Sequence, residues 1–128
     1  MILLINDNIT IADLQEKFNE CFPKLKIEFY SHPHHWKESS IQGELIDPEK
    51  RIGEIRKKHE HGVMEIKSWY QTGRVEQDFQ KLFGLNAQIF RNENGKWRQT
   101  IASDELTLGQ QQLISAPINK LTQKITLK

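Results

Sequence analysis

The five histidines are the side chains of this sequence best suited to metal chemistry, and they form two groups. One group is His32, His34 and His35, and the other is His59 and His61. Imidazole nitrogens bind zinc, nickel and copper, so both groups, with Glu38 or Glu60, could share one ion if the strands that they flank are neighbours. No spacing matches a zinc signature, because His-Glu-His differs from His-Glu-x-x-His and the chain has a single cysteine. A zinc-binding protein or metal-dependent hydrolase is therefore an alternative hypothesis, and solvated loop histidines are the simpler interpretation.

A run of basic side chains indicates a second possible chemistry, which is nucleic-acid binding. The run consists of Lys50, Arg51, Arg56, Lys57 and Lys58, with Trp36, Trp69 and Tyr70 as stacking aromatics. Acidic residues interrupt it, and the whole chain has 18 basic and 17 acidic residues, a formal net charge of +1. Such a balance gives no long-range attraction to nucleic acid or to an anionic membrane. Nucleic-acid binding through Arg56, Lys57 and Lys58 is therefore only the second alternative.

Motifs for covalent or phosphoryl-transfer chemistry are absent from the sequence. It contains no Gly-x-Ser-x-Gly elbow, no Gly-rich phosphate loop and no Rossmann fingerprint. Pairs such as His61 with Glu65 can be written down, but 17 carboxylates and five histidines generate many pairs by chance. The sequence therefore favours a non-enzymatic protein without a cofactor, and it leaves the question open.

Aromatic residues on the predicted strands are better candidates for binding. Alternation predicts a strand from Val63 to Tyr70, in which Trp69 and Tyr70 lie on opposite faces, so that at least one points away from the helices. Phe90 and Trp97 raise the same question on a predicted hairpin. Cover by the chain itself is the simpler explanation, and contact with a partner protein or a second copy is the other. The leading hypothesis is a non-enzymatic protein-interaction module that uses Trp69, Tyr70, Phe90 and Trp97.

The first elements must position the histidine-rich stretch. Residues 2 to 5 could form a short strand, and Thr10 with Asp13 has the spacing of a capping box for a helix that Pro23 ends. Cys21 is expected to be a small buried residue at the end of that helix. The alternation from Lys24 to Tyr30 predicts a strand with one buried face.

Turn-forming residues and prolines predict two further segments after that strand. Residues 31 to 50 form a long connection, and such connections are usually functional or mobile. A short helix is expected from Pro48 or Glu49 to Lys58, with Asp47 as its cap and Pro48 at its first position.

A second long helix is predicted from Arg74 to Phe83, with Gly84 in the left-handed position that ends it. Thr107 and Gln110 again have capping-box spacing for a short helix. Residues 118 to 128 are expected to be a mobile tail or a late edge strand.

The segment around Asn94-Gly95 predicts a β-hairpin between these helices. A two-residue turn pairs Asn92 with Trp97, whereas a four-residue turn over Asn92 to Gly95 pairs Phe90 with Trp97. We expect the longer turn, because it gives an aromatic cross-strand contact and places Phe90 and Trp97 on one face.

These elements predict one α+β domain over residues 1–128, a mainly antiparallel sheet with helices on one face, in the order α-β-α(short)-β-α-β-β followed by a short helix and the tail. We find no internal repeat. The single Cys21 indicates a reducing compartment, and no apolar run approaches the roughly 20 residues needed to span a bilayer. The N-terminal segment lacks the features of a signal peptide. We therefore expect a cytoplasmic protein.

Several segments resemble a known group of sequences. They are Phe-Gly-Leu-Asn-Ala-Gln-Ile-Phe-Arg, Gly-Lys-Trp-Arg-Gln-Thr and Asp-Glu-Leu-Thr-Leu-Gly-Gln-Gln between Phe83 and Gln112, together with Ile-Ala-Asp-Leu-Gln-Glu-Lys-Phe and Leu-Lys-Ile-Glu-Phe near the start. They resemble a family of small uncharacterised bacterial proteins. The resemblance implies a compact bacterial domain and no particular activity, ligand or catalytic residue.

Overall fold

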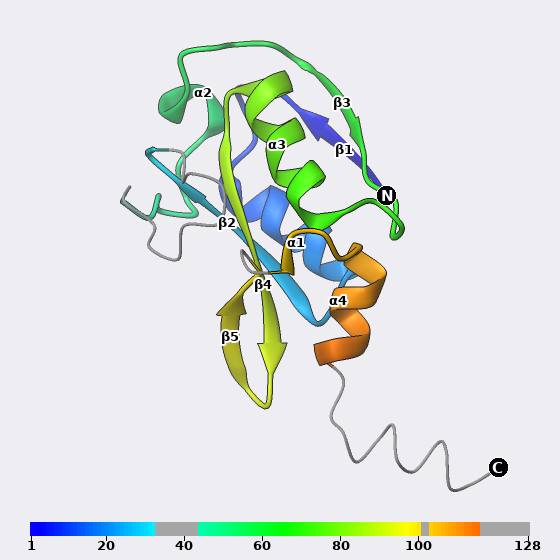
Figure 1. The fold of residues 1–128 in the computed structure, drawn as a ribbon. Helices are drawn as coiled ribbons and strands as arrows, with labels where there is room; N and C mark the ends of the chain where they lie inside the picture. The colour runs from blue at the N-terminus through cyan, green and yellow to red at the C-terminus, as the bar shows by residue number, and fades with distance from the viewer. Residues whose placement is uncertain (33–43, 101–102, 116–128) are drawn as a thin grey trace, which may run out of the picture.

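A computed structural model describes residues 1–32, 44–100 and 103–115 of the chain, and it confirms the α+β class (Figure 1). Its elements are β1 (Ile2–Ile5), α1 (Ile11–Cys21), β2 (Leu25–Tyr30), α2 (Ile52–Ile55), β3 (Gly62–Glu65), α3 (Thr72–Phe83), β4 (Asn86–Glu93), β5 (Lys96–Gln99) and α4 (Leu108–Ser115). The expected order lacked β1, and the expected tail at 118–128 lies outside the described residues.

The strands form two antiparallel sheets, where the sequence led us to expect one. β1 pairs with β3, and β2, β4 and β5 form a three-stranded sheet in the order β2-β4-β5. As Figure 1 shows, the long helices α1 and α3 lie against one side of the three-stranded sheet. The expectation that helices cover one face is therefore confirmed for this sheet. None of the described helices is long and apolar enough to cross a membrane.

The core lies between that sheet and its helices. Leu25, Ile27 and Phe29 are buried while the residues between them are half-buried, which confirms the predicted alternation of this strand. Phe29 meets Phe79 of α3 edge to face, with ring centroids 5.5 Å apart. Aromatic packing of this kind holds the sheet and α3 together.

The ends of the long helices follow the predicted capping rules. Thr10 and Asp13 form a full capping box at the start of α1. Gly84 ends α3 in the left-handed region, with φ of 66°, and its N–H donates to the carbonyl of Gln80. Cys21 is exposed, so its expected burial was wrong. The helix ends there, and the core position goes to the next residue, Phe22.

Two predicted elements are shorter than their sequence patterns. The strand expected to reach Tyr70 ends at Glu65, because the chain turns at Lys67–Tyr70 on its way to α3. The helix expected between Pro48 and Lys58 is limited to Ile52–Ile55, since residues 47–50 form a turn and Arg56 is extended. In both cases tertiary backbone contacts outweighed the local pattern.

The hairpin has the shorter of the two possible turns. Asn94 and Gly95 have φ of 54° and 83°, as a tight primed turn requires, and Asn92 pairs with Trp97. The expected four-residue turn is therefore wrong. Phe90 pairs with Gln99. Phe90 and Trp97 still lie on one face, because Phe90 is two positions along the strand from Asn92, the residue directly opposite Trp97.

The two halves of the fold have similar orders of elements, a similarity that we did not find in the sequence. The first half runs β1-α1-β2-α2, and the second half runs β3-α3-β4-β5-α4. In each half the residue before the long helix forms an antiparallel bridge with the residue before the short one. These bridges are Thr10 with Arg51 and Gln71 with Thr107. We call each the helix junction of its half.

The backbone hydrogen bonds of the two junctions correspond when the start of α1 is matched with that of α4 and the start of α2 with that of α3. The carbonyl of Asp7 accepts from the N–H of Gly53 at 3.0 Å, and the carbonyl of Asp104 accepts from that of Gly73 at 2.9 Å. The segments Asp-Asn-Ile-Thr-Ile-Ala from Asp7 and Asp-Glu-Leu-Thr-Leu-Gly from Asp104 have matching types at most positions. A six-residue similarity this far apart is detectable only once the contacts are known.

Strand pairing connects the two halves. Leu3 of β1 lies opposite Met64 of β3, and Ile27 of β2 lies opposite Ile89 of β4. Each of these ladders therefore joins a strand of the first half to a strand of the second half.

Candidate functional site

The outer face of the β1–β3 ladder carries the most exposed cluster of aliphatic side chains in the described residues. Ile2, Leu4 and Val63 are 66%, 61% and 60% exposed. Leu4 and Val63 lie directly opposite each other, and Ile2 is two positions along β1, so the three share one face. We call these three residues the aliphatic face.

The opposite side of the ladder explains this exposure. Leu3, Ile5 and Met64 point inward and are almost completely buried. Among the described residues no third strand joins this ladder, so both of its outer edges lack a strand neighbour. The sequence signal was present, since Ile-Leu-Leu-Ile is apolar on both sides of a strand, but it was interpreted only as secondary structure.

The predicted aromatic residues Trp69 and Tyr70 lie in the turn before α3 and not on a strand. Trp69 is 67% exposed, and the ammonium of Lys67 lies 5.3 Å from its ring centroid. Tyr70 packs partly against the core, and the guanidinium of Arg74 lies 4.0 Å from its ring centroid. Trp69 is thus an exposed aromatic, whereas Tyr70 is largely occupied by its own chain.

Phe90 and Trp97 lie close together on the outer face of the three-stranded sheet. The ammonium of Lys26 is 5.3 Å from the Phe90 ring centroid and 5.0 Å from that of Trp97. Trp97 is 40% exposed and Phe90 is half-buried. The cation covers part of both rings, so this surface is less apolar than the aliphatic face.

The two histidine groups are not brought together by neighbouring strands, because β2 and β3 belong to different sheets. The hydroxyl of Ser31 lies 3.0 Å from Nδ1 of His32. His34 and His35 lie outside the described residues. The metal site across the two groups therefore has no support from strand pairing.

His59 and His61 instead meet Asp7 at the first helix junction. Nδ1 of His59 lies 2.9 Å and Nε2 of His61 lies 3.5 Å from Oδ2 of Asp7. The other carboxylate oxygen accepts from Nε and Nη2 of Arg56, at 3.1 and 2.9 Å. In the described part of the chain, no group of three or more His, Cys, Asp or Glu residues is arranged to hold a metal ion.

The charge state of Asp7 follows from these contacts. Desolvation raises its pKa, but hydrogen bonds from Arg56, His59 and His61 outweigh it, so the pKa lies below the ordinary value. Arg56 has a fully buried side chain and also donates to the carbonyl of Phe83 at 3.0 Å. It is therefore not available for a phosphate backbone, and of the predicted nucleic-acid residues only Lys57 and Lys58 are exposed.

The second helix junction contains a buried pair of acids. Glu76 and Asp104 are only 6% and 4% exposed, and Oε2 of Glu76 accepts from the N–H of Ile89 at 2.7 Å. Burial, followed by the charge of Asp104, raises the pKa of Glu76 well above its ordinary value. Sequence reasoning missed this pair, since neither residue stands in a recognisable motif.

Comparisons with known proteins add no activity to this geometry. No protein-family model, no curated protein and no solved structure matches the chain. The surfaces of the molecule are therefore the basis on which we propose a function.

Proposed function

We propose that this domain is a non-enzymatic protein-interaction module whose aliphatic face is covered by another protein. One observation carries the proposal: Ile2, Leu4 and Val63 form a contiguous aliphatic cluster in which every side chain is at least 60% exposed. Exposed apolar clusters that are contiguous in this way mark interaction surfaces more often than scattered apolar residues do.

The size of the cluster favours a transient contact or the centre of a larger interface. Three side chains bury much less than the roughly 800 Å² that each partner contributes to a standard interface. Trp69 and Trp97, the exposed members of the predicted binding set, are proposed as further contacts. We place the protein in a bacterial cytoplasm, which the single Cys21 supports.

A photo-cross-linking amino acid at position 4 tests the proposal in the native cell. We expect one adduct of discrete mass, and its mass distinguishes a second copy of the chain from a different protein. The Val63→Glu substitution in the same protein should reduce the adduct at least tenfold, because it puts a charge opposite position 4.

Position 113 provides the matched control, because Leu113 is 64% exposed but lies on α4, away from the aliphatic face. Leu113→Glu should leave the adduct unchanged. Absence of any adduct at position 4, or equal loss with both substitutions, would overturn the proposal. Thermal unfolding of each variant verifies that the exposed substitutions leave the fold intact.

A further inference from the structure

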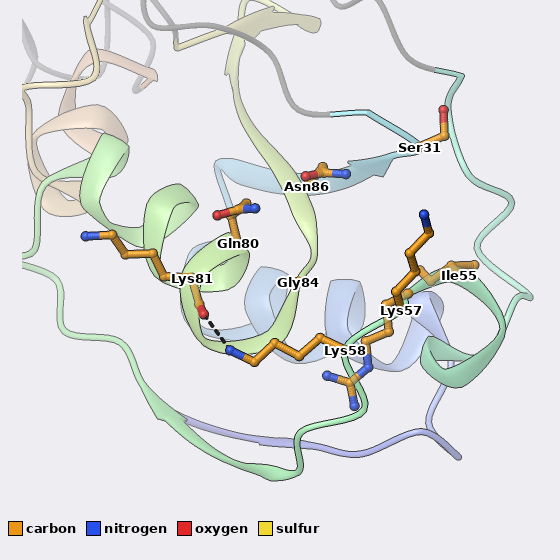
Figure 2. A pocket seen from close by; sticks show the side chains of 9 residues that line it. Ser31, Ile55, Lys57, Lys58, Gln80, Lys81, Gly84 and Asn86 are labelled. Carbon is orange, nitrogen blue, oxygen red and sulfur yellow. Dashed lines mark hydrogen bonds between the residues drawn. The ribbon is translucent and has the colours of Figure 1, made fainter.

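A pocket of about 500 Å³ opens between the two halves of the fold (Figure 2). Its walls are the segment after α2, the last turn of α3, the end of β2 at Ser31 and the start of β4 at Asn86. This volume is within the range of small-molecule sites in proteins. The pocket shares no lining residue with the aliphatic face.

Every charged residue that lines the pocket, among the residues that the structure describes, is basic. These residues are Arg56, Lys57, Lys58 and Lys81. No described acidic residue lines it, although the whole chain is almost balanced at a formal net charge of +1. The pocket is therefore a local concentration of positive charge, which favours an anionic ligand.

The four cations differ in what they can still bind. Arg56 is committed to Asp7 and to the carbonyl of Phe83. In Figure 2 the side chain of Lys81 extends away from the other lining residues. Lys57 has no hydrogen bond or ion pair with any described residue, and its side chain points towards the space beside Asn86. Lys57 is thus the cation best placed to meet a ligand.

The end of α3 would ordinarily disfavour an anion, because its carbonyl groups carry partial negative charge. Here two of those carbonyls already accept from cations. Nζ of Lys58 donates to the carbonyl of Lys81 at 3.0 Å, and Nη1 of Arg56 donates to that of Phe83 at 3.0 Å. The ammonium of Lys58 keeps two further protons for a ligand. These two hydrogen bonds therefore reduce the repulsion between the end of α3 and an anion in the pocket.

Uncharged polar groups complete the lining. The side-chain amide of Gln80 makes no hydrogen bond with the described residues, and Asn86 uses Nδ2 to donate to the carbonyl of Tyr30 at 3.2 Å. Ile55 adds an apolar contact. Two lysine ammonium groups can balance the charge of a dianion. The pocket is larger than one such group, so it has room for an organic part of the ligand.

We propose that this pocket binds a small organic molecule carrying a phosphate group, with Lys57 and Lys58 on the phosphate and Gln80 and Asn86 beside it. Lysine ammonium groups bind phosphate as point charges. The affinity should fall as salt is added, because both lysines are exposed and their interactions are screened.

Amide chemical-shift titrations of the full chain test the proposal, with ribose 5-phosphate, ribose and inorganic phosphate as probes. We expect ribose 5-phosphate to shift the amides of Lys57, Lys58 and Asn86 with a Kd below about 1 mM, and ribose to shift none. Lys57→Met should weaken binding about tenfold, the loss of roughly one ion pair. Lys17→Met, an exposed lysine on α1, is the matched control and should change nothing.

Four results would overturn the proposal. No shift at millimolar ribose 5-phosphate would exclude the site, and equal affinity for inorganic phosphate would exclude the organic ligand. Tighter binding of a single-stranded RNA oligonucleotide, with shifts that extend beyond the pocket, would favour a nucleic-acid surface instead. Unchanged binding in Lys57→Met would likewise contradict the assignment, and its unfolding temperature shows whether that variant is folded.

Discussion

The two helix junctions have the same backbone and opposite electrostatics. At the first, the carboxylate of Asp7 is 29% exposed and meets Arg56, His59 and His61. At the second, Asp104 is buried and its acidic neighbour Glu76 is buried with it. The first junction thus stabilises a negative charge, and the second disfavours one.

The comparison separates what the backbone requires from what the side chains add. Both junctions contain an aspartate that lies two residues before an aliphatic residue and three before a capping threonine, and both have a glycine across the bridge. The backbone bonds of the junction do not specify the ionisation of the carboxyl group. The neighbours of that group decide it, through burial and nearby charge.

The largest expected effect comes from Glu76→Gln, which removes one carboxyl group of the buried acid pair at the second junction. Because the folded state raises the pKa of Glu76, this group stabilises the fold below its unfolded pKa of about 4.3 and loses that contribution as pH rises through the folded pKa. Each unit of raised pKa is worth about 1.4 kcal/mol. The glutamine variant should lack this loss, so its stability relative to the natural protein should increase from pH 4 to pH 8.

Urea unfolding at several pH values measures this difference. A Glu16→Gln variant is the control, because Glu16 is exposed on α1 and should leave the pH profile unchanged. Parallel profiles for the natural protein and the Glu76 variant would show that the buried pair does not titrate as inferred.

The second effect compares the two bridging glycines. A methyl group on Gly53 would lie 2.7 Å from Cβ and 3.1 Å from the carbonyl oxygen of Asp7, whereas one on Gly73 would lie 3.0 and 3.4 Å from those atoms of Asp104. We expect Gly53→Ala to cost about 2 kcal/mol of unfolding free energy and Gly73→Ala about 1 kcal/mol, since overpacking exceeds the gain in helix propensity.

Gly109→Ala is the matched control for this pair. Gly109 occupies at the second junction the position that Ala12 has at the first, and an added methyl group would come no closer than 3.4 Å to another atom, the carbonyl oxygen of Ser68. This variant should be neutral or slightly more stable in the same unfolding measurement. If Gly53→Ala were equally tolerated, the first junction would be looser than its contacts indicate.

The smallest expected effect comes from Asp7→Asn, which removes the negative charge of the carboxylate at the first junction. The lowered pKa means that Asp7 contributes stability above its unfolded pKa of about 3.9, and that this contribution is lost as pH falls through the folded pKa. The asparagine variant should therefore melt a few degrees lower at pH 7 and match the natural protein near pH 2. Partial exposure of Asp7 keeps the effect small, and a difference that persists at pH 2 would contradict the charge-based explanation.

The sequence predicted elements well wherever a local rule was sufficient. The capping box at Thr10 and the left-handed Gly84 are confirmed, because each depends on neighbours within four residues. The strand expected to reach Tyr70 and the helix expected to reach Lys58 were wrong, since long-range backbone bonds to other segments end them early.

The candidate sites were harder to predict for the same reason. The sequence identified Trp69 and Trp97 as unusual, and both are exposed. The aliphatic face needs Val63 to lie opposite Leu4, and the basic pocket needs Lys57 beside Asn86. These residues are far apart in the chain. Strand pairing brings the first set together, and contacts of Arg56 and Lys58 with the end of α3 bring the second set together.

Local chemistry in the sequence thus determined where α1 starts, where α3 ends and which face of β2 is buried. Tertiary structure decided that the strands form two sheets, and that Asp7 and Asp104 occupy equivalent positions at the two helix junctions in opposite environments. The physical reason is the distance along the chain over which each interaction acts. Capping and turn geometry involve adjacent residues, whereas burial, pairing and the electrostatics of a carboxyl group depend on every segment that folds against it.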